Sequence, residues 1–421
     1  MGGGLLQLVA YGAQDVYLTG NPQITFFKVV YRRHTNFAIE SIQQTYNGQT
    51  EFGNTINCTV SRNGDLINRV YVEIDVKGLG SPPNPNAKHA RYVNYLGLKL
   101  LKNVVVEIGG QQIDKHYSDW MFIWNELSLP IGKRYGYDKM VGANGDELSK
   151  VEETKSTKLY IPLEFWFCRN IGLALPLIAL QYHEVKFKIE FSEKDEIALM
   201  YESDDTISNE VELTSEAKIK IGSQLLCNIY VDYIFLDTDE RRKFAQLSHE
   251  YLIEQLQFTG EEQSNQQQIR LNFNHPVKEL VWVSKWAQNH TNDNNSLVNW
   301  NNYSIEDNAD ADGKNSFVQG SIKLNGNDRI ANREGRYFDL VQPYQHHTNI
   351  PKNGGINVYS FALKPEEHQP SGTLNMSRID SAHLHVKIND AKKKEGTVLI
   401  YAINYNVLRI LSGMGGLAYS N

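Results

Sequence analysis

The chain has few cysteines, and they do not form a framework. Its 421 residues include only Cys58, Cys168 and Cys227, which are far apart and odd in number. This pattern excludes a network of paired disulfides and a Cys-x-x-Cys metal site. We expect buried, reduced thiols and assembly in a reducing compartment.

Long apolar runs are also missing. The longest, Ile171–Leu180, contains Pro176 and is about half the length that a membrane-spanning helix needs. The N-terminal Met1-Gly2-Gly3-Gly4 has no basic region of the kind that begins a secretion signal. Leu6 stands where a myristoylation motif requires Ser or Thr. We therefore expect no membrane span, no signal peptide and no myristoyl group.

No part of the chain is strongly basic. Lys and Arg together number 42 against 49 Asp and Glu, which gives a net charge of −7 with both signs mixed along the sequence. A protein that holds a phosphate backbone needs a basic patch or stripe. We expect no direct contact with nucleic acid.

Motifs for catalysis and for metal binding are absent as well. The sequence has no GxSxG, no Walker loop and no GxGxxG after a strand. His383 and His385 share one face of a predicted strand, as in metal-binding jelly rolls of the cupin kind. Asp390 is badly placed to join them, and the closing strand has no histidine. We expect no enzymatic activity, no catalytic residues, no cofactor and no metal site.

Three other features have a structural interpretation. His183 is read as an ordinary histidine of a strand, and His346-His347 lie in a loop beside Pro343 with no partner that the sequence identifies. The glycines of Gly413–Gly416 follow the last predicted strand and no helix comes after them. They predict a flexible tail.

Strand-forming sequence is abundant, and it is arranged twice. Aromatic residues make up 11% of the chain, and Asn and Gln are common, which favours an all-β fold. Each half contains a turn followed by an apolar strand, then a Gly-turn hairpin, then a His-bearing strand, and finally a long closing strand. The matching segments are Arg62–Asp75 and Asn274–Lys285, Val104–Ile113 and Ser321–Ile330, Tyr182–Phe191 and Ala382–Ile388, and Leu226–Leu236 and Val398–Ile410. One β module used twice predicts two consecutive eight-stranded jelly-roll sandwiches, with short helices in their loops.

The predicted organisation has five parts: a leader over 1–24, a first jelly roll over 25–237, a linker over 238–248, a second jelly roll over 249–413 and a C-terminal tail over 414–421. Phe26–Tyr46 opens the first sandwich, with a strand start at Phe26–Tyr31. Tyr117–Leu127 is apolar at helical spacing and predicts a short helix. Asp237–Ser248 predicts a short capped helix in the linker.

Three loops interrupt the strands. Gly78–Asn86 is rich in proline, Ser192–Ala217 is acidic, and Trp286–Gln319 is very rich in Asn and Asp, which places it on an outer, solvated surface. Asn-x-Ser/Thr sequons occur at Asn57, Asn289, Asn294, Asn302 and Asn375. The three in the Asn-rich loop, Asn289, Asn294 and Asn302, are the candidate sites for covalent glycans, although chance sequons are an equal explanation in so Asn-rich a chain.

Several long segments resemble the major capsid proteins of large nucleocytoplasmic DNA viruses, the group that includes chlorella and mimivirus-like viruses. The segments are Gln7–Ser41, Ser61–Ile74, Phe165–Phe187, Asp237–Gln257 and Phe361–Asp380. They keep the family's order and spread over the whole chain. The Asn-rich and proline-rich loops carry no match.

The resemblance implies a double jelly roll and a structural role. Three chains would form a homotrimeric capsomer of pseudo-hexagonal outline, because each chain supplies two similar lobes. The partners it implies are neighbouring capsomers, minor capsid proteins and, near the leader, an internal viral membrane. The location it implies is the virion capsid, assembled in the host cytoplasm, with long loops facing outward and carrying sugars in some relatives.

Two alternatives stay open at this stage. Aromatic-rich strands and long loops also suit a carbohydrate-binding or carbohydrate-cleaving β-sandwich protein, which would need a concave site with converging carboxylates or stacked aromatics. A minor capsid paralogue with the same fold is the other. Within the capsid interpretation, Trp120, Trp124, Trp300 and Tyr303 are candidate exposed anchors for contacts between chains, because Trp and Tyr often carry interface energy.

Overall fold

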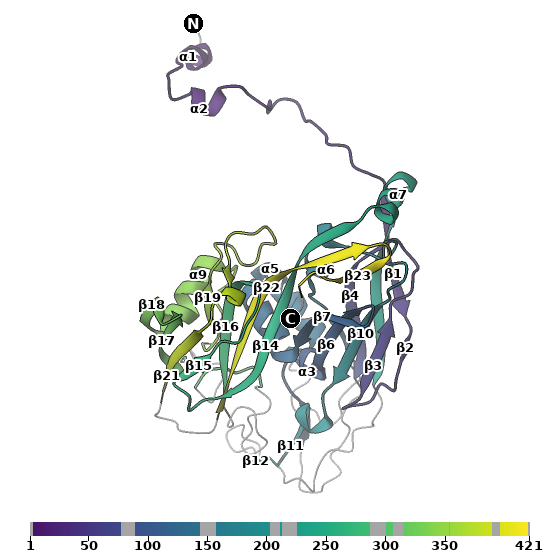
Figure 1. The fold of residues 1–421 in the computed structure, drawn as a ribbon, viewed down its shortest axis with the longest axis vertical. Coiled ribbons are helices and arrows are strands. Elements are labelled where there is room, and N and C mark those ends of the chain that lie inside the picture. The colour runs from purple at the N-terminus through teal and green to yellow at the C-terminus, as the bar shows by residue number, and fades with distance from the viewer. Residues whose placement is uncertain are drawn as a thin grey trace. The chain divides into compact units, whose positions relative to one another are not determined.

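The computed structural model describes residues 3–76, 89–143, 157–202, 211–212, 225–286, 300–305, 315–352, 354–389 and 396–419 (Figure 1). The proline-rich loop lies outside these residues, as do half of the acidic segment and most of the Asn-rich loop. The chain divides into two compact units, residues 1–36 and residues 37–421, and each is described by itself. Within the described residues, no helix combines the length and the apolar character needed to cross a membrane.

The first unit extends the predicted leader from residue 24 to residue 36 and keeps that name below; its described residues form two short helices and no strand. Helix α1 spans Gly3–Val9 and α2 spans Val16–Thr19. The predicted strand at Phe26–Tyr31 is wrong: its residues form no ladder, and Phe27 is 98% exposed. A sequence of strand-forming residues becomes a strand only when a neighbour completes its backbone hydrogen bonds. The first strand, β1, begins eleven positions after Phe26 and spans Phe37–Gln44.

The first sandwich has two antiparallel sheets. One has the order β1-β13-β4-β8, and the other has the order β2-β3-β10-β6-β7. Their bounds are Leu226–Leu236 for β13, Leu66–Val76 for β4, Thr157–Pro162 for β8, Tyr46–Asn47 for β2, Thr55–Thr59 for β3, Val185–Phe191 for β10, Leu101–Ile108 for β6 and Gln111–Tyr117 for β7. The short strand β9, Leu175–Pro176, pairs with β4. Three further strands, β5 (His89–Tyr92), β11 (Ala198–Glu202) and β12 (Val211–Glu212), form a separate small sheet.

The second sandwich repeats the arrangement. Its sheets have the orders β14-β22-β16-β19 and β15-β21-β17-β18, and β20 pairs with β16 as β9 does with β4. The bounds are His249–Gln263 for β14, Gly396–Leu411 for β22, Pro276–Trp286 for β16, Asn357–Ser360 for β19, Leu374–Asn375 for β20, Gln268–Arg270 for β15, Ala382–Ile388 for β21, Phe317–Leu324 for β17 and Asn327–Glu334 for β18. The last strand, β23, spans Met414–Leu417 and pairs with β22.

The strand orders of the two sandwiches correspond position by position. The closing strands β13 and β22 each lie between an edge strand and the strand that follows the turn, β4 or β16. The hairpins β6–β7 and β17–β18 are likewise equivalent, and each turns through two residues in the left-handed region, Gly109-Gly110 and Asn325-Gly326. The predicted repeat and the all-β double jelly roll are confirmed.

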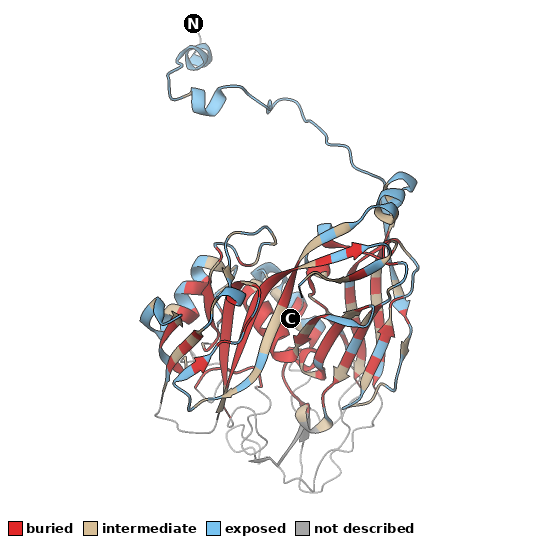
Figure 2. Cartoon of the chain, in the orientation of Figure 1, coloured by how far each residue is buried: buried red, intermediate tan, exposed pale blue. Residues whose placement is uncertain are grey.

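The burial patterns explain how the sequence forms these sheets. Strand β10 alternates buried and more exposed residues, because one face lies on the core and the other faces outward. Strand β16 is almost continuously buried, since segments of the chain cover both of its faces. Figure 2 shows buried residues running through the strands of both sandwiches.

Short helices occupy the connections. Helix α4, Ser118–Ser128, confirms the helix predicted at Tyr117–Leu127. Helix α7, Thr238–Gln246, confirms the capped helix in the linker, with the Asp237 carboxylate accepting from the N–H of Thr238. The others are α3 (Leu96–Leu100), α5 (Ile131–Val141), α6 (Trp166–Arg169) and α9 (Gln342–His346), the 3-10 turns at Ile171–Leu173, Lys194–Glu196 and Met376–Arg378, and a π turn at Tyr337–Val341.

The hydrophobic core is continuous between the sandwiches. Its largest cluster combines first-sandwich residues such as Ile123 and Phe165 with second-sandwich residues such as Val281 and Tyr401. A second cluster, which includes Trp282 and Phe338, belongs to the second sandwich alone. We call the region where residues 37–237 meet residues 249–417 the seam. The long strands β14 and β22 run along it (Figure 1).

Candidate functional site: the seam between the sandwiches

The aromatic half of the seam is built on α4. The Trp120 ring lies 5.3 Å from Tyr401 of β22, and the Phe122 ring lies 5.9 Å from Trp300. The indole N–H of Trp300 donates to the carbonyl oxygen of Asn94 over 2.5 Å. Helix α4 presents these rings because its apolar residues recur at helical spacing on a helix that is buried almost all round.

The prediction of exposed aromatic anchors is therefore wrong. Trp120 and Trp124 are 4% exposed, and Trp300 and Tyr303 are 1% exposed. Their aromatic partners include residues of the other sandwich in the same chain, so they stabilise the seam and are not available at the surface. The Tyr303 hydroxyl donates to Oδ1 of Asp119 over 2.9 Å, and Lys285 pairs with Oδ2 of the same carboxylate over 2.5 Å.

The charged half of the seam centres on Glu254 of β14. Its carboxylate pairs with Arg169 from α6 over 2.5 Å and with Lys278 of β16 over 2.7 Å. Burial by itself would raise the pKa of Glu254, but the charge of Arg169, the neighbouring His368 and Lys278 together lower that pKa to about 2. Burial lowers the pKa of Lys278, against the opposing effect of Glu254. The group is an ion network in which each charge has a partner.

His347 forms a second ion network beside the first. Its Nε2 lies 2.9 Å from Glu279 of β16, its Nδ1 lies 2.9 Å from Glu366, and its side chain is fully buried. Burial would lower the pKa of His347, but the charge and hydrogen bond of Glu279, followed by those of Glu366, raise it to about 9. The segment that follows reaches the first sandwich, because the N–H of Asn349 donates to the carbonyl oxygen of Leu127 over 2.9 Å. The sequence identified His347 but none of these partners.

The seam also includes the C-terminal strand. His183 precedes β10, and its Nδ1 lies 2.8 Å from the carbonyl oxygen of Gly415 in β23. Gly415 packs so closely that a Cβ added to it would lie 2.6 Å from a methyl group of Leu180. The flexible tail predicted from Gly413–Gly416 is therefore wrong: β23 closes against both sandwiches.

The remaining histidine pair lies away from the seam. The rings of His383 and His385 are 6.2 Å apart on β21, opposite β15 and β17. Among the residues that the structure describes, no three His, Cys, Asp or Glu side chains gather closely enough to hold a metal ion.

Cys58 and Cys227 are buried and Cys168 is half-buried, and burial raises the pKa of all three thiols. It brings the pKa of Cys58 to about 11 and those of Cys168 and Cys227 to about 12. None of the three forms a disulfide. Thiols with so little thiolate are inert as nucleophiles. The prediction of buried thiols is confirmed for Cys58 and Cys227, while Cys168 lies at the margin of the core.

The predicted glycan sites have different outcomes. Asn289 and Asn294 lie outside the described residues. Asn302 is 1% exposed, and its Oδ1 accepts hydrogen bonds from the backbone N–H and the hydroxyl of Ser304. A glycan on Asn302 conflicts with this burial in the folded chain, and the prediction is withdrawn for that residue. Of the other sequons, Asn57 and Asn375 are exposed.

A cavity of about 330 Å³ adjoins the ion networks, lined by Arg169, Glu254, Glu366 and His368 among others. A glycosidase needs a carboxylic acid whose pKa is raised so that it can protonate the leaving group. Glu254 is held ionised, with its pKa at about 2, and the pKa of Glu366 is also lowered, since its hydrogen bonds with His347 and Thr348 outweigh its burial. These carboxylates are suited to ion pairing and not to acid catalysis.

Family models cover nearly all of both sandwiches. The model "Major capsid protein N-terminus" matches residues 25–237, and the model "Large eukaryotic DNA virus major capsid protein" matches residues 240–416. The chain belongs to the major capsid protein family of large eukaryotic DNA viruses. The resemblance seen in the sequence is confirmed, and the family is structural and not enzymatic.

Individual relatives match this chain in sequence along their full length. The major capsid protein of Pyramimonas orientalis virus is 51% identical, and that of Paramecium bursaria Chlorella virus 1 is 44% identical, each with 100% of both chains covered. A chain in the quasi-atomic model of the PBCV-1 virus capsid is 39% identical, with a TM-score of 0.76 over 94% of this chain and 100% of that chain. The Faustovirus major capsid protein is 14% identical with a TM-score of 0.75, which shows a shared fold.

Proposed function

We propose that this chain forms a homotrimeric capsomer of pseudo-hexagonal outline that tiles an icosahedral shell. The observation that carries the proposal is the repeated strand order within one chain, held together by a continuous core across the seam. Three such chains present six similar lobes around an axis. The relatives support the same role, since a chain of the PBCV-1 capsid has this fold over its full length. The chain is thus a virion component that assembles with copies of itself.

The finer organisation belongs to the same proposal. The two jelly rolls would be the domains 25–237 and 249–413, joined by the linker at 238–248. The leader would face the inside of the shell, near minor capsid proteins and an internal membrane, with assembly in the host cytoplasm. The long loops would face outward, and Asn289 and Asn294 would be the sites at which covalent glycans are sought by mass spectrometry of glycopeptides.

The oligomeric state of the purified chain tests the proposal. Three chains of 48.1 kDa give a particle of about 144 kDa, which light scattering after gel filtration would detect. Averaged electron micrographs should show a six-sided outline with threefold symmetry. A chain that remains monomeric over the whole accessible concentration range would contradict the proposal.

The copy number separates a major capsid protein from a minor paralogue. Quantitative mass spectrometry of purified particles should find this chain as their most abundant protein. A low copy number confined to a few positions of the shell would favour the minor paralogue, which has the same fold but a different place in the shell.

A further inference from the structure

Strand β1 is an open edge of the first sandwich. Among the described strands it pairs only with β13, and it lies at the end of its sheet. Every second residue of such a strand presents its N–H and C=O away from the neighbouring strand. Proteins usually protect an edge with proline, lysine or a bulge. The sequence of β1, FAIESIQQ, has no proline and no lysine, and its pairing with β13 has no register shift.

A small apolar cluster is incomplete on the same side. Leu66, Ala174 and Ile234 form it, and Phe244 of α7 packs against it. Ile39 of β1 lies opposite Ile234, so their side chains share one face of the sheet. Ile39 is still 50% exposed. A further strand beside β1 would cover Ile39 and extend this cluster.

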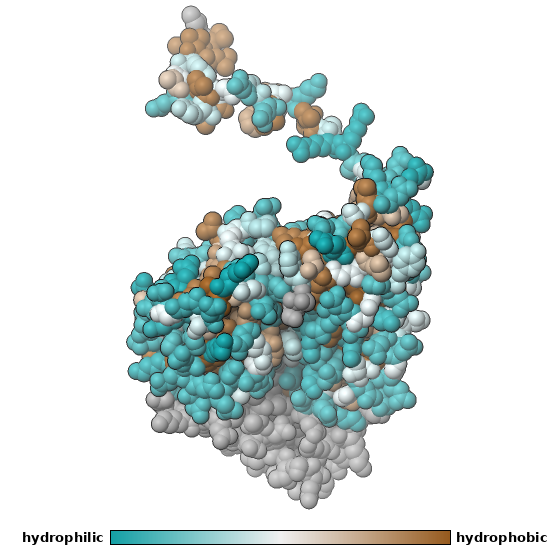
Figure 3. All heavy atoms as spheres, in the orientation of Figure 1, coloured by the Kyte–Doolittle hydropathy of each residue, from teal (hydrophilic) through white to brown (hydrophobic). Residues whose placement is uncertain are grey.

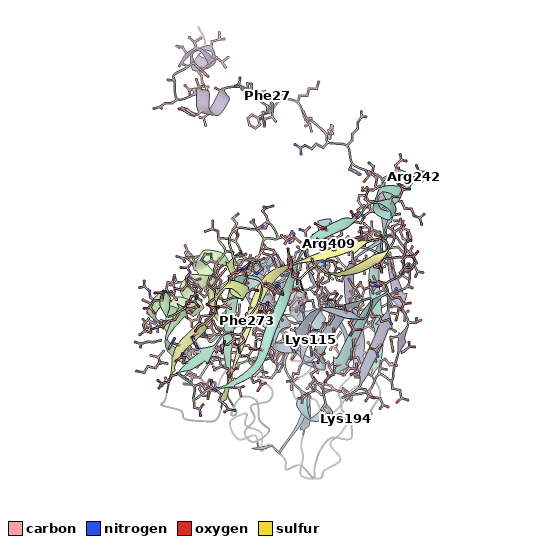
Figure 4. All side chains as sticks on the ribbon, viewed as in Figure 1. Phe27, Lys115, Lys194, Arg242, Phe273 and Arg409 are labelled. Atoms are coloured by element: carbon pink, nitrogen blue, oxygen red, sulfur yellow. The ribbon has the colours of Figure 1, made fainter. Side chains whose placement is uncertain are left out.

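The leader contains a segment that matches a missing strand. Residues 24–31, ITFFKVVY, are rich in β-branched and aromatic side chains and form no ladder in the single chain. Their exposed fractions are 68% for Ile24, 89% for Phe26, 98% for Phe27, 70% for Val29, 77% for Val30 and 84% for Tyr31. Figure 3 shows apolar residues along the leader, and Figure 4 shows the Phe27 side chain on it. So much contiguous apolar surface is characteristic of a segment that is buried in an assembly.

We propose that residues 24–31 of one copy add as a strand to the β1 edge of a second copy, so that neighbouring chains exchange strands. The inference rests on the proposed self-assembly. Its elements are two complementary halves that each chain carries, an apolar strand-forming segment and an open strand edge. The charges also match, because Lys28, Arg32 and Arg33 accompany the segment while Glu40 is exposed on β1.

The partner is assigned to a second copy because a capsid protein assembles with copies of itself, and each copy carries the same edge. Five residues, 32–36, separate the segment from its own β1, a length that would allow a hairpin. A hairpin within one chain is therefore the rival pairing that the experiment must distinguish. Every other copy of the chain offers the same open edge.

Disulfide trapping between separately prepared chains tests the pairing. Each of four leader variants is mixed with an Ile39→Cys chain of different tag length, and the mixture is then assembled and mildly oxidised. The four variants are Phe26→Cys, Phe27→Cys, Val29→Cys and Val30→Cys. The scan covers both faces and several registers, because a disulfide requires Cα atoms about 4.4–6.8 Å apart. The expected result is a covalent dimer that contains one chain of each kind for at least one leader position. The matched control replaces the Ile39→Cys chain with a Lys188→Cys chain. Lys188 is exposed on β10, but β10 has no open edge, because β3 and β6 lie on its two sides.

The outcomes are distinguishable. A trimer in which none of the leader cysteines links to Ile39→Cys above the control overturns the strand exchange and leaves the capsomer intact. A disulfide that forms only within one chain carrying both Val29→Cys and Ile39→Cys also overturns it, in favour of a hairpin. A protein that stays monomeric overturns the proposed function itself.

A second measurement follows assembly directly. Phe27→Ser combined with Val29→Ser should raise the concentration needed for half-assembly at least tenfold, with the circular dichroism spectrum unchanged. Tyr17→Ser combined with Leu18→Ser removes equally exposed side chains from α2, at 92% and 85%, and should have little effect. Equal effects of the two pairs would count against a specific role for residues 24–31.

Discussion

His347 is a buried histidine that we expect to be charged at neutral pH. Since Glu279 and Glu366 raise its pKa from 6.5 to about 9, its contribution to stability is complete below pH 6.5. That contribution is lost as the pH rises to about 9 and amounts to at most about 3 kcal/mol. The urea midpoint should therefore fall across this range. The fall in the urea midpoint should be smaller in His347→Gln and unchanged in His346→Gln. An equally large fall in His347→Gln would show that His347 is not the group responsible.

Glu254 should matter more to stability than Lys278. Glu254→Gln leaves the buried Lys278 beside the partly exposed Arg169 with no carboxylate between them, and breaking a buried pair in this way costs about 3–5 kcal/mol. Lys278→Met leaves the Glu254–Arg169 pair in place and keeps most of the side-chain volume, so the loss should be smaller. Thermal unfolding of both variants measures the difference. Equal losses would show that Arg169 does not neutralise Glu254.

At the residue scale, the sequence identifies few of these contacts. Glu254 stands in a strand beside Ile253 and Gln255, and a charged residue on the core side is the only local sign of a buried ion pair. Its partner Arg169 is 85 positions away, and nothing in the local pattern links them. The prediction of exposed aromatic anchors is wrong for the same reason. The local sequence places Trp120 in a helix and Trp300 in a loop, and neither context shows whether another part of the chain covers the side chain.

At the scale of elements, strands with a partner in the chain are predictable. The alternation or the apolar runs of β10, β16, β21 and β22 reflect the faces they bury, and those segments were found in the sequence. The strand predicted at Phe26–Tyr31 has equal strand propensity but no neighbour within the chain. At β23 the opposite error occurs, because a strand forms where none was predicted. Its Met-Gly-Gly-Leu sequence has little strand propensity, and contacts with Ile410, Leu180 and His183 hold it in place.

The docking of β23 should therefore be sensitive to the size of residue 415. Gly415→Val would place atoms within 2.6 Å of Leu180 and 3.2 Å of Ile108, and overpacking of this kind costs about 1–3 kcal/mol. We expect faster hydrogen exchange in residues 408–417 and earlier cleavage of the C-terminus by carboxypeptidase. Gly416→Ala, whose added Cβ meets only the end of the Gln111 side chain, should behave like the unsubstituted chain. Slow exchange at β23 in Gly415→Val would mean that the seam tolerates the added side chain.

At the scale of the whole molecule, the seam makes one body, residues 37–421, out of two jelly rolls. The repeat in the sequence predicts two similar modules and would be equally consistent with two lobes that move independently. The structure adds a core that passes between them, with ion networks at its margin. The proposed capsomer, in which each chain imitates two subunits, depends on this rigidity, because the angle between the lobes must be constant for copies to pack in a shell.

This coupling predicts that residues 37–421 unfold in one cooperative transition. Trp300→Ala removes a fully buried indole, its hydrogen bond to Asn94 and its contact with Phe122, and should cost about 3–5 kcal/mol. Because that contact joins the sandwiches, calorimetry of this variant should show two partly separated transitions. Phe338→Ala is the control, since Phe338 packs in the second sandwich's own cluster; it should lower stability by a similar amount, with its largest effect on hydrogen exchange in that sandwich. Two transitions in the unsubstituted chain would show that the seam is an interface between independent domains, and the rigid pseudo-hexagonal capsomer would then need contacts between chains to fix the angle between its lobes.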